Sequence, residues 1–368
     1  MKTLLSTVFF VLYGIVAFGQ GEQLKDVVNN LAFFNTQKDL KYLSEAKKAV
    51  DRSFYSTKDT SNTQKNVYRA VVYSSILYVD SNNTLGQPDT FLRYTTTLLN
   101  KVQRQQKVYS YQTLVDYSKR CLANAYLRAG TKAYNKGDFS AAAESFEKSK
   151  TMSNEIPQVD AFIARSFEKA GKQQQAGEVY EALSRKENAP LTYFQSAASS
   201  YLSVNDTSKA LSVIRRGRRT YAADPYLVTQ EANIYNDKKD YTALKGVLEP
   251  LLKVKPDNED VLFLAANCLD HLNDYDNAGN FYNRLIELNP NAFPPVLNLG
   301  YLNLRKAAKL TGEGQQKSLT DAQNWLEKAN ELNPDDVNCL KGLQMVYQQT
   351  RNQYQLQRVN TKLKQLSK

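Results

Sequence analysis

The sequence is poor in the residues that metal and redox chemistry requires. It contains a single histidine, His271, and three cysteines, Cys121, Cys268 and Cys339, which are widely separated and odd in number. A single histidine argues against a histidine-based catalytic triad and against most zinc and iron sites. The cysteine spacing fits neither a disulfide framework nor a zinc knuckle. We therefore expect three small buried thiols, no metal and no cofactor.

Sequence motifs of catalysis are also missing. The chain has no phosphate-binding glycine loop, no Gly-x-Ser-x-Gly turn and no cysteine–histidine pair in a plausible order. Carboxylates cluster at residues 257–262 and 270–277, where the pattern predicts a connecting loop and a turn, and aspartate and asparagine are common in turns. The sequence therefore predicts a protein that is not an enzyme, and we assign no catalytic residue.

Long hydrophobic runs are absent except at the N terminus. Residues 4–18 are mostly apolar and follow a basic start at Lys2, but a membrane-spanning helix needs roughly 20 such residues. Small residues at Ala17 and Gly19 are typical of a secretory cleavage site. We predict that residues 1–19 are a signal peptide, that the protein is exported to the periplasm of a Gram-negative bacterium, and that no transmembrane segment remains. The alternative is an uncleaved segment that anchors the chain in the inner membrane.

Acidic residues are outnumbered, with 37 Asp and Glu against 48 Lys and Arg and a formal net charge of +11. Four arginines, Arg215, Arg216, Arg218 and Arg219, surround Gly217. Nucleic acid is not the expected partner, because export separates the protein from the chromosome and only Tyr221 could stack a base nearby. Charge runs on helices are usually solvated faces. The alternative is a secondary basic patch that contacts polyanions of the cell envelope.

Internal repetition is the strongest positive feature of the chain. Small residues recur at steps of 34 residues at Gly130, Ala164, Ala198, Ala232, Ala266 and Gly300. In phase with them run Ala142, Ala176, Ala210, Leu244 and Ala278, and then Phe146, Tyr180, Ile214, Leu248 and Tyr282. Gly137, Gly171, Asn205 and Asn273 mark turns, because glycine and asparagine tolerate positive φ. The spacing predicts helical hairpins that bury their apolar faces only by stacking.

One segment shows the pattern most fully. Residues 260–290 carry Leu262, Ala265, Ala266, Leu269, Ala278, Tyr282, Leu285 and Pro290 at the characteristic offsets. This pattern resembles the tetratricopeptide repeat, a 34-residue helix-turn-helix. The resemblance implies an all-α fold, a right-handed superhelical solenoid of stacked hairpins that binds a partner protein.

The extent of the 34-residue repeat predicts how the chain is divided into domains. We predict a solenoid over residues 122–334, interrupted by a Gly-rich polar loop near 311–320, and a capping hairpin over 335–368. Residues 20–121 are less regular, with helical spacing at 40–54, 65–79 and 91–102. They are interpreted as degenerate hairpins of the same solenoid, and a separate small helical domain is the alternative.

The resemblance also implies where a partner would bind. It places the first helix of each hairpin on a concave groove, whose candidate binding residues are Tyr134, Arg165, Tyr226, Asn233, Asn236, Phe263 and Asn267. It places the four arginines on a second helix, pointing mainly to solvent. The amides suit a peptide backbone, although polar residues also line any solvated face. We predict a non-enzymatic protein-interaction scaffold of the cell envelope. The alternative is a periplasmic glycan- or small-ligand-binding protein of the uptake or cell-wall machinery.

Overall fold

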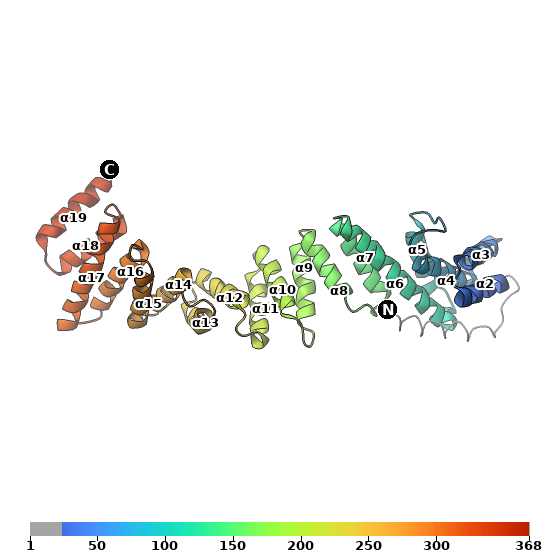
Figure 1. Cartoon of the computed structure of the whole chain (residues 1–368), viewed down its shortest axis with the longest axis horizontal. Helices are drawn as coiled ribbons and strands as arrows, with labels where there is room; N and C mark the ends of the chain where they lie inside the picture. Colours follow the sequence, from blue (N-terminus) through green and yellow to red (C-terminus); the bar gives the residue numbers. More distant parts are fainter. Residues whose placement is uncertain (1–23, 368) are drawn as a thin grey trace. The chain divides into compact units, whose positions relative to one another are not determined.

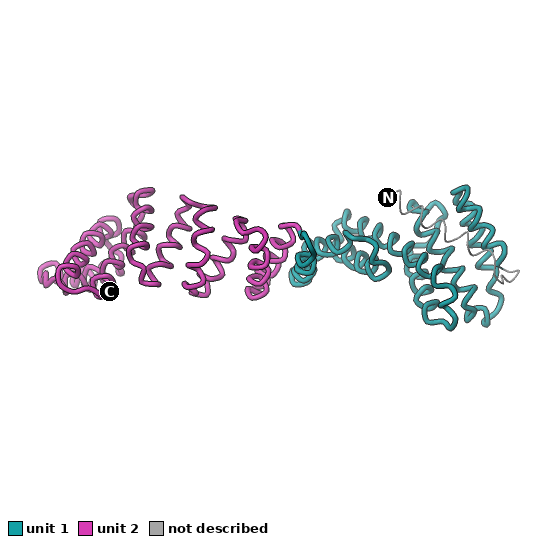
Figure 2. The backbone as a smooth tube through the Cα atoms, turned by 90° about the horizontal axis from the view of Figure 1, so that it is seen from below, with its two compact units in different colours: residues 1–189 teal, residues 190–368 magenta. Residues whose placement is uncertain are grey.

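The computed structural model describes residues 24–367, so the predicted signal peptide lies outside the described residues. Within that range the chain forms eighteen α-helices, two short 3-10 helices and no strand (Figure 1). This confirms the all-α helical repeat. None of the helices in the described range is long and apolar enough to cross a membrane. The chain divides into two compact units, residues 1–189 and 190–368 (Figure 2).

Unit 1 contains the first eight helices of the described chain. They are α2 (Lys25–Gln37), α3 (Leu40–Arg52), α4 (Thr63–Val79), α5 (Phe91–Gln103), α6 (Gln112–Asn135), α7 (Phe139–Met152), α8 (Val159–Lys169) and α9 (Gln173–Ser184). The 3-10 helices η2 (Thr57–Ser61) and η3 (Val108–Tyr111) precede α4 and α6. The three helices expected before residue 122 are confirmed as α3, α4 and α5, whereas the sequence pattern did not single out α2.

Unit 2 contains ten helices in five hairpins. They are α10 (Leu191–Ser203), α11 (Thr207–Thr220), α12 (Pro225–Asp237), α13 (Tyr241–Val254), α14 (Glu259–His271), α15 (Tyr275–Leu288), α16 (Phe293–Ala307), α17 (Gly312–Leu332), α18 (Val337–Gln349) and α19 (Gln353–Leu366). Each helix packs against the next one along the chain, and one apolar core runs from α12 to α19.

The hairpin turns share one backbone geometry. Gly137, Gly171, Asn205 and Asn273 all have positive φ, as predicted. Lys239 occupies the same turn position with φ 55°, although lysine does not favour the left-handed backbone conformation. In each turn the next residue donates its N–H to the carbonyl five positions back, for example Asp240 to Tyr235 at 2.9 Å. This is the Schellman ending of a helix, and it satisfies carbonyls that the helix leaves open.

The recurring small residues are sites of close helix approach. A Cβ added to Gly130 would lie 2.7 Å from the ring of Phe146, and one added to Gly300 would lie 2.7 Å from Leu326 Cγ. Ala164, Ala198, Ala232 and Ala266 are fully buried at the equivalent positions. The predicted core of the repeat is therefore confirmed, because a larger side chain there would hold the two helices apart.

Helix α6 connects the irregular and regular parts of unit 1. It packs against α4 and α5 on one side and against α7 on the other. Residues 121 and 122, on either side of the predicted domain boundary, both lie within this helix. The interpretation of residues 20–121 as degenerate repeats remains a prediction.

The predicted loop at residues 311–320 is wrong. Helix α17 begins at Gly312 and runs to Leu332, so the additional residues lengthen this helix at its N-terminal end. Leu319 and Ser318 are buried there, and α17 packs along α16. The glutamines and lysine of this segment favour helix, and burial of Leu319 outweighs the cost of its two glycines.

Candidate functional site

Side-chain contacts link the first helices of successive hairpins in unit 2. The amide of Gln195 on α10 donates to Asp224, the residue that caps α12, at 3.2 Å. Arg305 on α16 donates through Nε to Asp270 on α14 at 3.0 Å. The hydroxyl of Tyr301 on α16 donates to the carbonyl of Asn338 on α18 at 2.6 Å. The first helices of neighbouring hairpins therefore lie side by side along one face of this unit.

Five of the predicted groove residues lie on α12 and α14. Tyr226, Asn236, Phe263 and Asn267 are half-buried, and Asn233 is exposed. Burial raises the pKa of Tyr226, and a hydrogen bond from Ser199 on α10 partly offsets this. The ring of Phe263 meets Tyr282 edge-on, with the ring centres 6.0 Å apart.

Three side-chain amides of this face make no hydrogen bond with another described residue. They belong to Asn233, Asn236 and Asn267. Each amide can donate and accept, as a peptide backbone also does. The three amides can therefore bind a backbone without first breaking an internal contact.

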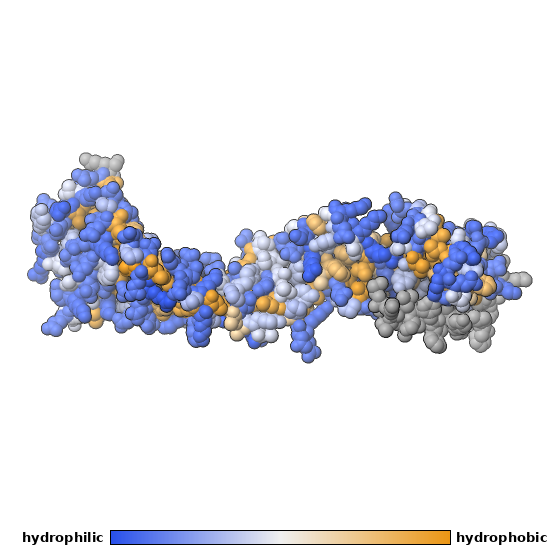
Figure 3. Space-filling model, viewed as in Figure 1, coloured by the Kyte–Doolittle hydropathy of each residue, from blue (hydrophilic) through white to orange (hydrophobic). Residues whose placement is uncertain are grey.

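Sequence reasoning missed the continuation of this face on α16. One repeat after Phe263 and Asn267 stand Leu297 and Tyr301, both half-buried. Met345 on α18 is 50% exposed. Figure 3 shows hydrophobic residues gathered over the α14–α16 part of the unit, between hydrophilic ones. Extending the 34-residue step by one unit would have found Leu297 and Tyr301.

The other two predicted groove residues belong to unit 1. Tyr134 lies at the end of α6, where its ring meets Phe139 edge-on with the ring centres 5.1 Å apart. Arg165 lies on α8 and is exposed. They form a set separate from the five residues of unit 2.

The arginine cluster on α11 is partly an internal ion-pair network. Arg218 pairs with the carboxylate of Glu231 on α12, which is 5% exposed. Arg215 donates through Nε to the hydroxyl of Tyr235 at 2.8 Å. The expectation that all four arginines point mainly to solvent is wrong for Arg218, whose side chain is only 18% exposed. A buried carboxylate on the facing helix attracts this guanidinium more strongly than bulk water does.

Gly217 explains why the arginine run contains a glycine. A Cβ at this position would lie 2.9 Å from Leu227 Cδ1 and 3.0 Å from Phe194 Cδ1. The glycine therefore lets α11 pack closely against α10 and α12. This stretch packs against two neighbouring helices. Of the four arginines, Arg215 and Arg219 are exposed, and the Arg215 side chain is 56% exposed while it is hydrogen-bonded to Tyr235.

The comparison with protein families identifies the repeat. The tetratricopeptide repeat family model matches residues 259–292, which span α14 and α15. The chain therefore carries a tetratricopeptide repeat (TPR) at α14 and α15, within its all-α helical repeat fold. A search of the curated proteins returned no match.

The search of solved structures returned chains of low sequence identity. The structure described as YrrB, a TPR protein with an unusual peptide-binding site, is 16% identical, with a TM-score of 0.41 over 54% of this chain and 98% of its own. A MamA RS-1 double mutant is 17% identical, with a TM-score of 0.41 over 48% of this chain and 94% of its own. MamA from Desulfovibrio magneticus RS-1 is 14% identical, with a TM-score of 0.36 over 48% and 96%.

Three buried carboxylates of the described chain have structural partners. Glu231 and Asp270 pair with arginines, and Asp80 accepts the backbone N–H groups of Thr84 and Leu85 at 2.7 and 2.8 Å. Their charges are compensated within the fold. The described residues contain no group of three or more His, Cys, Asp or Glu that could hold a metal ion.

The three cysteines are free and buried, as expected. Burial raises the pKa of Cys121 and of Cys339 to about 12 and that of Cys268 to about 11. Thiolate is the nucleophilic and metal-binding form. At neutral pH the three side chains therefore act as small apolar residues.

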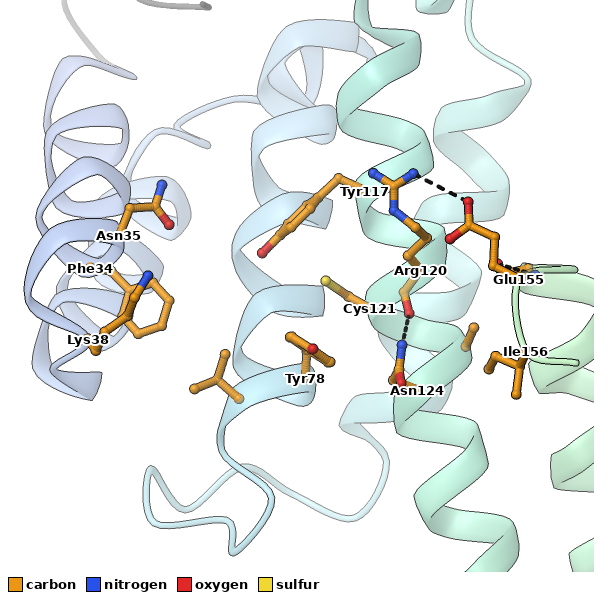
Figure 4. Close-up of a pocket in the computed structure, with 13 residues that line it drawn as sticks. Phe34, Asn35, Lys38, Tyr78, Tyr117, Arg120, Cys121, Asn124, Glu155 and Ile156 are labelled. Atoms are coloured by element: carbon orange, nitrogen blue, oxygen red, sulfur yellow. Dashed lines mark hydrogen bonds and ion pairs between the residues drawn. The ribbon is translucent and has the colours of Figure 1, made fainter. Parts of the chain in front are cut away.

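Unit 1 contains a cavity of about 300 Å³. It lies between α2, α4, α6 and the connection from α7 to α8 (Figure 4). Its walls come from Phe34, Asn35, Lys38, Tyr78, Val79, Tyr117, Arg120, Cys121, Ala123, Asn124, Ser153, Glu155 and Ile156. Sequence reasoning did not single out this region, because its lining residues come from four separate segments, two of which precede the regular repeat.

Proposed function

We propose that the TPR protein is a non-enzymatic scaffold of the bacterial cell envelope that binds an extended segment of a partner protein. The segment binds along α12, α14, α16 and α18 of unit 2. The observation that carries the proposal is the set of side-chain amides without internal hydrogen bonds at Asn233, Asn236 and Asn267, on α12 and on α14, which also carries the partly exposed Phe263. Amides in this arrangement pair with a peptide backbone, and the apolar side chains receive its side chains.

The envelope location rests on the sequence of the N terminus. The basic start followed by the apolar run over residues 4–18 supports export to the periplasm. Fractionation of the producing bacterium tests this proposal. Release by osmotic shock supports a cleaved periplasmic protein, and sedimentation with inner membranes supports the uncleaved anchor. Recovery in the cytoplasm contradicts both.

A protein partner is favoured over a glycan. Glycan sites present several exposed aromatic faces in one pocket, whereas Tyr226 and Phe263 lie on different helices and Phe263 packs against Tyr282. The exposed arginines Arg215 and Arg219 add a peripheral contact with envelope polyanions.

The binding face is tested by pull-down from envelope extract, with the full chain as bait. The test variant combines Asn233→Ala with Asn267→Ala. The control combines Asn280→Ala with Asn283→Ala, two exposed asparagines on the second helix α15. Loss of two hydrogen bonds should weaken binding roughly tenfold.

The outcomes are distinct. A protein retained by the wild type and the control but lost from the Asn233/Asn267 variant supports the proposed face. A partner retained equally by all three chains places binding elsewhere, and the absence of any specific partner contradicts the scaffold.

A further inference from the structure

The cavity of unit 1 has an apolar interior. Phe34, Tyr117 and Cys121 are 7%, 8% and 3% exposed. The hydroxyl of Tyr117 is already hydrogen-bonded to Ser75, at 3.0 Å. Figure 4 shows Phe34 on α2 facing Tyr78 and Cys121 across the cavity. Apolar cavities of about 150 Å³ stay dry and accept ligands the size of benzene, so this cavity of about 300 Å³ accommodates a longer apolar body.

Basic side chains outnumber acidic ones in the lining of the cavity. Arg120 and Lys38 belong to its lining, against a single carboxylate, Glu155. The guanidinium of Arg120 lies between Tyr117 and Glu155 (Figure 4), and its Nη1 is 3.7 Å from Glu155 Oε1, which is too far for a strong hydrogen bond. The excess of positive charge favours an anion.

Arg120 also has an unused donor. Its Nε is buried and makes no hydrogen bond with any described residue. A buried N–H group without a partner is unfavourable and calls for an explanation. The Nε–H and the neighbouring Nη–H of a guanidinium form the fork that binds a carboxylate through both oxygens.

We propose that this cavity binds an amphipathic monocarboxylate of the medium-chain fatty-acid class. The hydrocarbon chain occupies the space between Phe34, Tyr78 and Cys121. The carboxylate binds to the guanidinium of Arg120, and Lys38, on the α2 side of the cavity, adds to the positive charge of the lining. This site lies in unit 1 and is independent of the partner-binding face of unit 2.

Isothermal titration calorimetry of the purified full chain tests the site. Decanoate is the probe, decanol carries a similar chain without the carboxylate, and acetate carries the carboxylate without the chain. We expect saturable binding of one decanoate per chain, weaker binding of decanol and no binding of acetate. Absence of saturable decanoate binding overturns the proposal, and so does binding of acetate as tight as that of decanoate.

Variants separate the two halves of the site. Arg120→Gln should weaken decanoate binding about tenfold or more while changing decanol binding little, because it removes a charge-assisted contact. Arg93→Gln, at an exposed arginine of α5, is the matched control and should bind like the wild type. Equal decanoate affinity of the Arg120 and Arg93 variants overturns the assignment of Arg120.

A second variant blocks the cavity. Ile156 lies in the connection between α7 and α8, so Ile156→Trp adds bulk without altering a helix. It should abolish binding of both decanoate and decanol. The helical circular dichroism signal and the thermal midpoint verify that the variant is folded. A folded variant that binds decanoate like the wild type contradicts the location.

Discussion

The guanidinium of Arg218 on α11 forms an ion pair with Glu231 on α12, whose carboxylate is almost fully buried. This ion pair joins two hairpins, so part of the arginine-rich stretch around Gly217 has a structural role. Arg218→Ala would leave the Glu231 carboxylate with the hydroxyl of Tyr235, which donates to it at 3.1 Å, and with the longer ion-pair contact from Arg215, at 3.6 Å.

We expect Arg218→Ala to lower the free energy of unfolding by up to about 3–5 kcal/mol, because it removes the closest cationic partner of a buried carboxylate. Arg219→Ala, at an exposed neighbour, should change it by less than about 0.5 kcal/mol. Urea denaturation measures both values. Equal effects of the two substitutions would show that the ion pair contributes no stability.

Substitution of Gly217 and of Gly246 by alanine should change the stability in opposite directions. Gly217→Ala should destabilise the protein by about 1–3 kcal/mol, because the new methyl group would overlap Leu227 and Phe194. Gly246→Ala, inside α13, meets no atom within 4 Å and should stabilise the protein by about 0.5–1 kcal/mol through helix propensity. The shifts in thermal midpoint should therefore have opposite signs. A shift of the same sign would show that the close packing at Gly217 relaxes easily.

The ion pair of Asp59 makes the free energy of unfolding depend on pH in the acid range. Its hydrogen bond with Lys65 lowers the pKa of Asp59 to about 2. A carboxylate with a depressed pKa stabilises the fold above its unfolded pKa, and this contribution is lost as the pH falls through the folded pKa. The stability advantage of the wild type over Asp59→Asn should therefore be constant above about pH 4 and shrink towards pH 2.

Urea midpoints measured across this pH range test the effect of Asp59. Asp89→Asn, at an exposed carboxylate, serves as the control. A wild-type advantage that persists unchanged at pH 2 would rule out the role of the Asp59–Lys65 pair.

The buried thiols predict low chemical reactivity. Since burial raises the pKa of Cys121 and Cys339 to about 12 and that of Cys268 to about 11, little thiolate exists at about pH 8. An aromatic disulfide reagent should react with the folded protein about a hundredfold more slowly than with the protein in denaturant. Rapid reaction of one thiol in the folded protein would show that its helix opens readily.

Much of the repeat was readable from the sequence because its physical requirements are local. Close helix approach demands Gly or Ala at positions such as Gly130 and Ala232, and reversal of the chain favours residues such as Gly137 and Asn205. Both requirements recur at a fixed spacing. The turn at Lys239 was not predicted, because the flanking helices impose a left-handed backbone conformation on a residue type that does not favour it.

The candidate sites were less predictable. The positions of Asn233 and Asn267 on this face followed from the repeat pattern. Tyr301 joins the face because α16 contacts α14, and Met345 extends it because α18 contacts α16. The pairing of Arg218 with Glu231 could not be read from the sequence either, because both residues look like ordinary surface charges.

The sequence by itself determined the period, the turns and the small residues of the core, because each of these depends on residues within one or two hairpins. Only the tertiary structure decided the helical form of residues 312–320, the internal role of Arg218 and the cavity beside Arg120. The physical reason is the same in each case. Burial against a separate segment changes the energy of a polar or charged group by more than its local sequence does.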